Sequence, residues 1–345
     1  MSEDKKVTPI SALGEFGLIE RLTKGFETVN ASTIKSVGDD AAVIDNKGKL
    51  TVVSTDLLVE GIHFDLVYTP LKHLGYKSIV VNLSDIYSMN AQPKQITVSI
   101  AISSRFTVEA LEELYEGIRL ACKTYQVDLV GGDTTSSLKG LVISVTAIGE
   151  ADEQDLVYRN GAKEGDLICV TGDLGAAYLG LQILEREKRI YLEHPDLQPE
   201  LENTEYMIGR QLKPEARKDV IAFFKEMELK PTSMMDLSDG LSSDIIHICR
   251  QSNVGCEINE GEVPINEEAY HMALKFNMDP ITCALNGGED YELLFTITPE
   301  DETKLGSDET FCIIGQITKK ETGTVLLTKG GNRHPLKAQG WNHFG

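Results

Sequence analysis

Strand-like and helix-like segments alternate along this chain, and the alternation restricts it to the α/β fold classes. The segment KLTVVSTDLLVEG, residues 49–61, is rich in β-branched residues, which is typical of a strand. Residues 71–91 are long, mostly apolar and free of proline, which favours a buried helix. The series continues with a strand at 95–102, an amphipathic helix at 107–125 capped by Thr107, and strands at 127–136 and 141–150.

Polar and glycine-containing sequence interrupts this pattern at residues 151–166 and predicts a link between two domains, 1–150 and 151–345. The length of 345 residues agrees, because one domain typically takes roughly 150 residues. The second series has strands expected at 166–172, 233–240, 291–297, 310–317 and 324–329, and helices at 176–187, 214–227 and 242–252. The expected fold class is therefore α/β (α+β) with two domains: an N-terminal mixed sheet with helices and a C-terminal α/β domain.

The formal net charge of −21 bears on the choice of partners. No run of Lys and Arg offsets it, so a nucleic acid backbone would be repelled. An acidic protein that handles phosphate groups therefore needs cations between itself and its ligand.

The six cysteines are scattered, without a CxxC pair, and are expected to be buried thiols in a reducing compartment. The N-terminal MSEDKK is polar and resembles no secretory signal, and no apolar segment reaches the roughly 18 residues of a membrane span. We therefore expect a soluble, cytoplasmic protein without a membrane partner.

Carboxylates recur beside apolar segments and glycine turns, beginning with Asp39 and Asp40 in IKSVGDDAAVI. Neighbouring side chains of a strand point to opposite faces, so only one of this pair needs to be a ligand. Ser54, Thr55 and Asp56 are expected where a strand ends, the usual place for a site in an open α/β sheet. A helix-capping role is the alternative for such Ser and Thr residues.

Asp85 lies within an apolar helical segment, without a Lys or Arg within one helical turn. Burying a carboxylate costs several kcal/mol unless a partner offsets its charge. A bound cation is the simplest such partner, and a salt bridge to a more distant residue is the alternative.

Three further segments place acidic residues near glycines. Asp133 is expected just past a strand, after Gly132, where backbone can approach a ligand closely. Asp236 and Asp239 would share a face if their turn were helical, although capping of the next helix by Asp239 or Ser242 is an alternative. Glu289 precedes a predicted strand in NGGEDYELLF.

These oxygen ligands favour magnesium, manganese or calcium over zinc, and the absence of an EF-hand loop disfavours calcium. Magnesium is usually held by a few carboxylates together with substrate phosphates, so phosphoryl chemistry is the leading reaction class. The sequence has no GxxxxGK[ST] loop, no GxGxxG after a strand, and no HRD with DFG, so P-loop and protein-kinase enzymes are excluded. Phosphates would be held through metals, the Gly132 backbone and a basic side chain such as Arg159, for which a plain surface role is the alternative.

Ten motifs in the same order make the chain resemble the thiamine-monophosphate kinase family over almost its whole length. They are GEFGLI, VGDDAAV, STDLLVEGIHF, NLSDIYSMNAQP, GGDTT, RNGAKEGD, VTGDLG, MDLSDGLSSD, NGGEDYELLF and QGWNHF. The wider superfamily includes aminoimidazole ribonucleotide synthetase and selenophosphate synthetase. The selenophosphate branch carries a reactive residue near its N-terminus, whereas the first cysteine here is Cys122.

The resemblance implies transfer of the ATP γ-phosphoryl group to thiamine monophosphate by a homodimer whose N-terminal sheets form a shared barrel. It implies several Mg²⁺ ions held by Asp40, Ser54, Thr55, Asp56, Asp85, Asp133, Asp236 and Asp239. By the same resemblance, Gly132, Asp133, Arg159 and Ser238 would contact ATP. His63, Glu289 and Trp341 would contact thiamine monophosphate. The residues expected to act in catalysis are Asp40, Asp85, Asp133, Arg159 and Asp236.

Two other functions stay open at this point. An ATP-dependent ring-closing or phosphate-activating synthetase of the same superfamily would release phosphate instead of forming a diphosphate. A non-catalytic divalent-metal binding protein would account for the acidic balance without any nucleotide.

Overall fold

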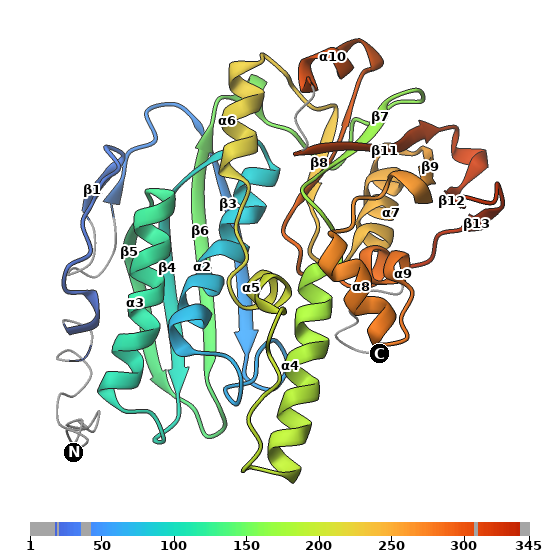
Figure 1. The fold of residues 1–345 in the computed structure, drawn as a ribbon. Coiled ribbons are helices and arrows are strands. Elements are labelled where there is room, and N and C mark those ends of the chain that lie inside the picture. The colour runs from blue at the N-terminus through green and yellow to red at the C-terminus, as the bar shows by residue number, and fades with distance from the viewer. Residues whose placement is uncertain (1–17, 19–20, 36–42, 307–309, 339–345) are drawn as a thin grey trace. The chain divides into compact units, whose positions relative to one another are not determined.

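The computed structural model describes residues 18, 21–35, 43–306 and 310–338 (Figure 1). Asp39, Asp40 and Trp341 lie outside the described residues. The chain divides into two compact units: the first comprises Met1–Ile86 and Ala91–Gln154, the second Tyr87–Asn90 and Asp155–Gly345.

A four-stranded mixed sheet forms the first unit, as predicted. Its strands, in spatial order, are β3 (Leu50–Val59), β6 (Val142–Ala151), β4 (Gln92–Ile102) and β5 (Asp128–Ser136). β4 and β5 are parallel, whereas β6 is antiparallel to both β3 and β4. Two short strands, β1 (Thr33–Lys35) and β2 (Val43–Ile44), pair separately.

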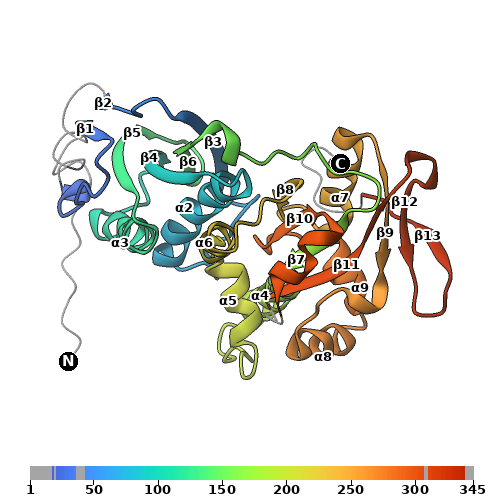
Figure 2. The ribbon, with the colours of Figure 1, turned by 90° about the horizontal axis from the view of Figure 1, so that it is seen from above.

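Two helices cover one face of this sheet, α2 (Leu71–Ser88) and α3 (Val108–Tyr125) (Figure 2). α3 begins at the predicted cap, because the Thr107 side chain accepts a hydrogen bond from Ala110 N. The helices meet backbone to backbone: a methyl group added at Gly75 would lie 1.9 Å from the Leu114 carbonyl oxygen. Gly117 approaches Lys72 equally closely, so glycine is required at this crossing.

The other face of the sheet carries solvent-exposed apolar side chains. Successive residues of a strand alternate between faces, and β6 is buried at every second position. On β3 the corresponding open-face residues include Val53, 60% exposed, and Leu57, 53% exposed. Exposed apolar residues of this kind are typical of a surface that binds another part of a protein or another subunit.

A seven-stranded sheet forms the second unit. Its spatial order is β13 (Arg333–Pro335), β12 (Thr324–Leu327), β9 (Gly255–Asn259), β11 (Phe311–Thr318), β7 (Leu167–Thr171), β10 (Leu293–Ile297) and β8 (Ser233–Asp236). All neighbouring strands are antiparallel except β9 and β12.

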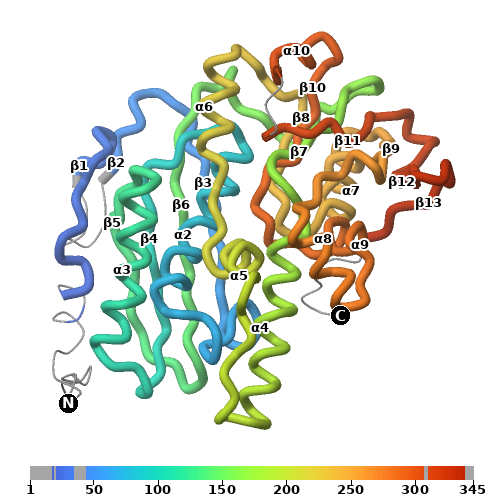
Figure 3. The backbone as a smooth tube through the Cα atoms, viewed as in Figure 1, coloured from blue at the N-terminus to red at the C-terminus, as the bar shows by residue number. Residues whose placement is uncertain are grey.

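The helices of the second unit pack on both faces of its sheet. They are α4 (Ala176–Glu193), α5 (Glu205–Leu212), α6 (Lys218–Glu226), α7 (Leu241–Ser252), α8 (Glu267–Lys275), α9 (Pro280–Asn286) and α10 (Glu302–Leu305). Figure 3 shows the chain leaving α4, turning back and forming α5 beside the same helix. Gly180 allows this packing, since a Cβ there would lie 2.1 Å from the Met207 carbonyl oxygen.

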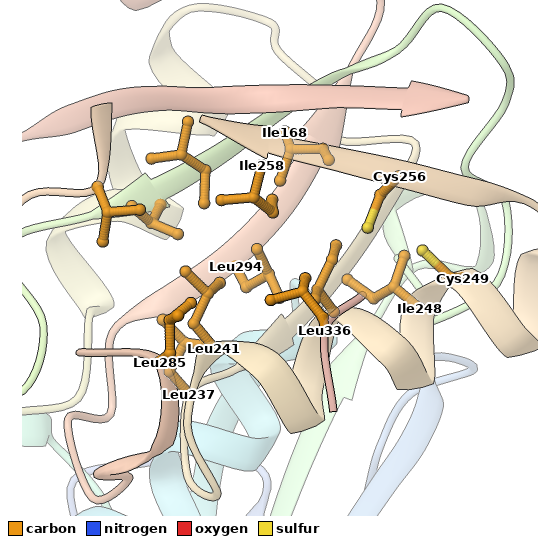
Figure 4. Close-up of a cluster of buried hydrophobic side chains, with 14 of the residues drawn as sticks. Ile168, Leu237, Leu241, Ile248, Cys249, Cys256, Ile258, Leu285, Leu294 and Leu336 are labelled. Carbon is orange, nitrogen blue, oxygen red and sulfur yellow. The ribbon is translucent and has the colours of Figure 1, made fainter. Parts of the chain in front are cut away.

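The main core of the second unit lies between its sheet and α7. Figure 4 shows Ile168 and Leu294 of the strands facing Leu241 and Ile248 of α7. A second cluster on the opposite face joins Phe224 of α6 to the strands. All six cysteines are free thiols, as expected, and five of them are buried. No helix of the described ranges is long and apolar enough to cross a membrane.

The fold class is confirmed, and two local predictions about strand ends are wrong. β3 does not end near Asp56 but continues to Val59, because its ten residues all pair with β6. Asp133 lies within β5, not beyond it, because β4 pairs with β5 as far as Ser136. The barrel shared by two subunits remains a prediction.

Candidate active site

In the first unit, β3 and α2 bring three of the predicted ligands together. Ser54 Oγ donates a hydrogen bond of 2.5 Å to Asp85 Oδ2. The backbone N of Asp56 donates to Asn82 Oδ1 at 2.9 Å, and Asn82 is one helical turn before Asp85. Ser54 and Asp56 share a face of β3 because they are two residues apart. Their face is the one that α2 covers.

The Asp56 carboxyl group is affected by its surroundings and by Asp85. Burial, and then the nearby charge of Asp85, raise the pKa of Asp56 to about 6. No group of three or more described His, Cys, Asp or Glu residues is arranged to hold a metal ion. Because Mg²⁺ is usually bound through one or two carboxylates, with waters and substrate phosphates as the remaining ligands, the pair Asp56 and Asp85 fits such an ion.

Asp133 and Thr55 lie on the opposite face from this pair. In the strand pairing, Asp133 of β5 lies opposite Ser99 of β4. The pairing of β4 and of β3 with β6 then places Ser99 level with the exposed Leu57 of β3. The Thr55 hydroxyl donates to the Val145 carbonyl oxygen at 2.9 Å. The first unit therefore does not bring these two residues together with Asp85.

His63 follows β3, and its tautomer is defined by a backbone contact. Val59 N donates to His63 Nδ1 at 3.1 Å. A ring nitrogen that accepts a hydrogen bond carries no proton, so in the neutral ring Nε2 is the donor. This nitrogen suits an anionic group such as a phosphate.

In the second unit, Asp236, Ser238 and Asp239 lie at the end of β8 and in the turn that follows. The turn is not helical, so the expected shared helical face does not form. Neither Asp239 nor Ser242 caps α7: its N-cap is Gly240, whose backbone N donates to Asp244 Oδ2 at 3.2 Å. Burial, and then the charges of Asp236 and Asp239, raise the pKa of Asp244.

The loop of residues 287–292 runs beside this turn. Glu289 N donates to the Ser238 carbonyl oxygen at 2.8 Å, and Tyr291 N donates to that of Leu237 at 2.9 Å. The strand expected to start at Tyr291 starts at Leu293 instead, because Tyr291 has a positive φ of 52°. The backbone of Glu289 is therefore held next to Ser238.

Arg159 is exposed and lies in the segment that leads into the second unit. Its carbonyl oxygen accepts a hydrogen bond of 3.4 Å from Ser252 Oγ, which also receives hydrogen bonds from Gly161 N and Ala162 N. These contacts hold the backbone and leave the side chain at the surface.

Comparison with known proteins places the chain in a protein family. The model for AIR synthase related protein, N-terminal domain, matches residues 38–151, and that for the C-terminal domain matches residues 163–328. Thiamine-monophosphate kinase of Bacillus subtilis (strain 168) is 35% identical over 343 residues, covering 96% of this chain and 100% of that protein. The enzyme of Aquifex aeolicus (strain VF5) is also 35% identical, covering 97% and 99%. The chain belongs to the thiamine-monophosphate kinase family.

Solved structures agree with the thiamine-monophosphate kinase assignment. AaThiL complexed with AMPPCP and TMP has a TM-score of 0.74 and 32% identity, covering 97% of this chain and 98% of that one. The hydrogenase maturation protein HypE in complex with ATP has a TM-score of 0.73 at 19% identity, which is evidence for the fold alone. The resemblance inferred from the motifs is confirmed, and the chain is an enzyme of the kinase class.

Sequence reasoning missed three polar residues that lie beside the predicted site residues of this thiamine-monophosphate kinase family member. Asn82 precedes Asp85 by three positions, a spacing that places both on one face of a helix. Asp244 was hidden within a predicted helix, next to the Ser242 considered as a cap. Gln211 of α5 contacts Glu289 across 78 residues of sequence, and no local signal indicates such a contact.

Proposed function

We propose that this member of the thiamine-monophosphate kinase family transfers the γ-phosphoryl group of ATP to the phosphate of thiamine monophosphate, giving thiamine diphosphate and ADP. The observation that carries the proposal is the near full-length similarity to these kinases, one of which was solved with AMPPCP and TMP. Both substrates are carried over to this chain by that similarity.

The proposed transfer is direct and in line. The attacking oxygen belongs to the acceptor phosphate, which is already anionic at neutral pH because its second pKa is about 6. The protein therefore needs to supply no general base. Its task is to align two phosphate groups that repel each other and to offset their charge. Trapping a phosphorylated protein with labelled ATP would overturn direct transfer.

Magnesium is the proposed metal, since the clustered side chains offer hard oxygen atoms. Asp56 and Asp85, with Ser54, form one group, and Asp236 and Asp239 form another. Asp40, Thr55 and Asp133 complete the proposed ligands. When bound, the ions supply the positive charge that a chain of net charge −21 lacks for holding a triphosphate.

The remaining residues divide between the two substrates. Arg159, with its exposed guanidinium, Gly132 and Ser238 are proposed to contact ATP. His63 Nε2 suits the acceptor phosphate as a donor. Glu289, being anionic, suits the cationic ring of thiamine better than its phosphate, and Trp341 would stack on the aromatic part.

We also propose a homodimer. The open apolar face of the first unit's sheet, with Val53 and Leu57 exposed, supports an interface in which two such sheets face each other. Sedimentation velocity at micromolar concentration tests it: a single monomer boundary would contradict it. A cytoplasmic location remains a prediction.

The assay incubates the protein with ATP, Mg²⁺ and thiamine monophosphate and measures thiamine diphosphate by fluorescence after oxidation. Formation of thiamine diphosphate in step with ADP is expected. Release of inorganic phosphate without the diphosphate would favour a synthetase, and metal binding without nucleotide turnover would favour a non-catalytic protein.

A further inference from the structure

Two adjacent residues of the short helix α5, Arg210 and Gln211, bind the loop of residues 287–292 through their side chains. We propose that they are positioning residues, which hold the Glu289 carboxylate in the orientation that binds the acceptor substrate. The inference rests on the proposed function, in which Glu289 contacts thiamine monophosphate.

Gln211 acts on the carboxylate itself. Its Nε2 donates a hydrogen bond of 2.7 Å to Glu289 Oε2, and the Gln211 side chain is buried, with 5% of its surface exposed. Tyr291 OH lies 3.5 Å from the other oxygen, Glu289 Oε1. A donor on each oxygen fixes the rotation of the carboxylate, and hydrogen bonds to a charged group are stronger than neutral ones.

Arg210 holds the backbone on which Glu289 stands. Its Nη2 donates to the carbonyl oxygen of Asp290 at 3.2 Å and to that of Asp173 at 3.1 Å. Its Nη1 donates to Glu292 Oε1 at 2.8 Å. One guanidinium thus joins the loop to the segment that leads from β7 into α4.

Glu292 is the buried carboxylate to which Arg210 is bound. Only 3% of its surface is exposed, and its second oxygen is bound by Arg217 and by Thr171 Oγ1. Two guanidinium groups on one buried carboxylate satisfy a charge that would otherwise be costly to bury. The loop is therefore held from one end by an ion-pair network.

The loop needs this support because its backbone is strained. Glu289 and Tyr291 have φ values of 59° and 52°, which residues with a side chain rarely adopt. Gly288 lies so close to the 237–239 turn that a Cβ would be 2.5 Å from the Ser238 carbonyl oxygen. Movement of the loop would therefore also disturb the turn that carries Ser238.

Gln211 is the residue on which to test the proposal, because removal of Arg210 would also break its ion pairs with the buried Glu292 and Asp290. Gln211→Leu keeps the volume but removes the donor, and Gln211→Glu places a like charge against Glu289. We expect the KM for thiamine monophosphate to rise about tenfold in Gln211→Leu and further in Gln211→Glu, with kcat and the KM for ATP nearly unchanged. Glu205→Gln, at the exposed start of α5, is the matched control and should leave all three constants unchanged.

A double-mutant cycle separates positioning from general damage to the fold. In a Glu289→Gln background, Gln211→Leu should add much less to the KM than it does in the wild type, because the contact is already weakened. Equal effects in both backgrounds, or an unchanged KM in Gln211→Leu, would overturn the positioning role while the wild type still forms thiamine diphosphate. A wild-type protein that forms none would overturn the proposed function, and the inference with it.

Discussion

Buried carboxylates are neutralised differently in the two units. In the second unit, Glu292 lies between the guanidinium groups of Arg210 and Arg217. In the first unit, Asp56 faces another carboxylate, Asp85, and its pKa rises to about 6 by burial and by that charge. Arginine offsets the charge of Glu292 within the fold, whereas for Asp56 and Asp85 the proposed magnesium ion would supply the positive charge.

The largest expected effect concerns the first unit. Asp85→Asn removes a charge with little change in volume, so we expect turnover to fall below detection while the free energy of unfolding stays within about 1 kcal/mol of the wild type. Thiamine diphosphate formation and urea unfolding measure the two quantities, and Glu113→Gln on the exposed side of α3 is the control. Near-normal activity at saturating Mg²⁺ would show that Asp85 holds no metal.

The opposite pattern is expected in the second unit. Glu292→Gln removes the carboxylate that lies between two guanidinium groups, which leaves Arg217 with Asp219 and Arg210 with the more distant Asp290. Breaking comparable buried pairs costs roughly 3–5 kcal/mol. Urea unfolding measures this loss, with Glu300→Gln, an exposed residue after β10, as the control. A loss of less than about 0.5 kcal/mol, the range of surface substitutions, would remove the contrast between the units.

A smaller effect, dependent on pH, is expected at Asp290. Burial raises the pKa of Asp290 to about 7, with Arg210 opposing the shift. Because the folded protein keeps this proton to higher pH than the unfolded chain does, unfolding releases a proton between about pH 4 and about pH 7. The free energy of unfolding therefore falls as pH rises through this window.

Asp290→Asn tests this directly, since the amide oxygen can still accept the hydrogen bond that Gly175 N makes to Asp290 Oδ2. As the pH rises from 5 to 8, the free energy of unfolding should fall in the wild type relative to the variant by up to a few kcal/mol, because the variant has no proton to lose at this position. Urea unfolding at four pH values across this range measures it. Parallel stability curves would mean that Asp290 titrates normally.

The sequence was a good guide where a signal is local. Thr107 caps its helix, and the β-branched segments form the strands, because both depend on near neighbours. It failed on where β3 ends, since only pairing with β6 decides that Asp56 is mid-strand. It failed likewise on Asp133, whose face is set by the pairing of β5 with β4 and of β4 with β6. It could not reveal the pair of Arg210 and Glu292, which are 82 residues apart. Asp40 and Trp341 remain predictions.

The glycine crossing of α2 and α3 has a practical consequence for protein engineering. Gly75 and Gly117 leave no room for a methyl group, so a larger residue at either position would push the two helices apart. Asp85 lies ten residues along α2 from Gly75, about 15 Å at the rise of a helix. A library intended to widen substrate range would therefore keep both glycines constant and diversify positions elsewhere.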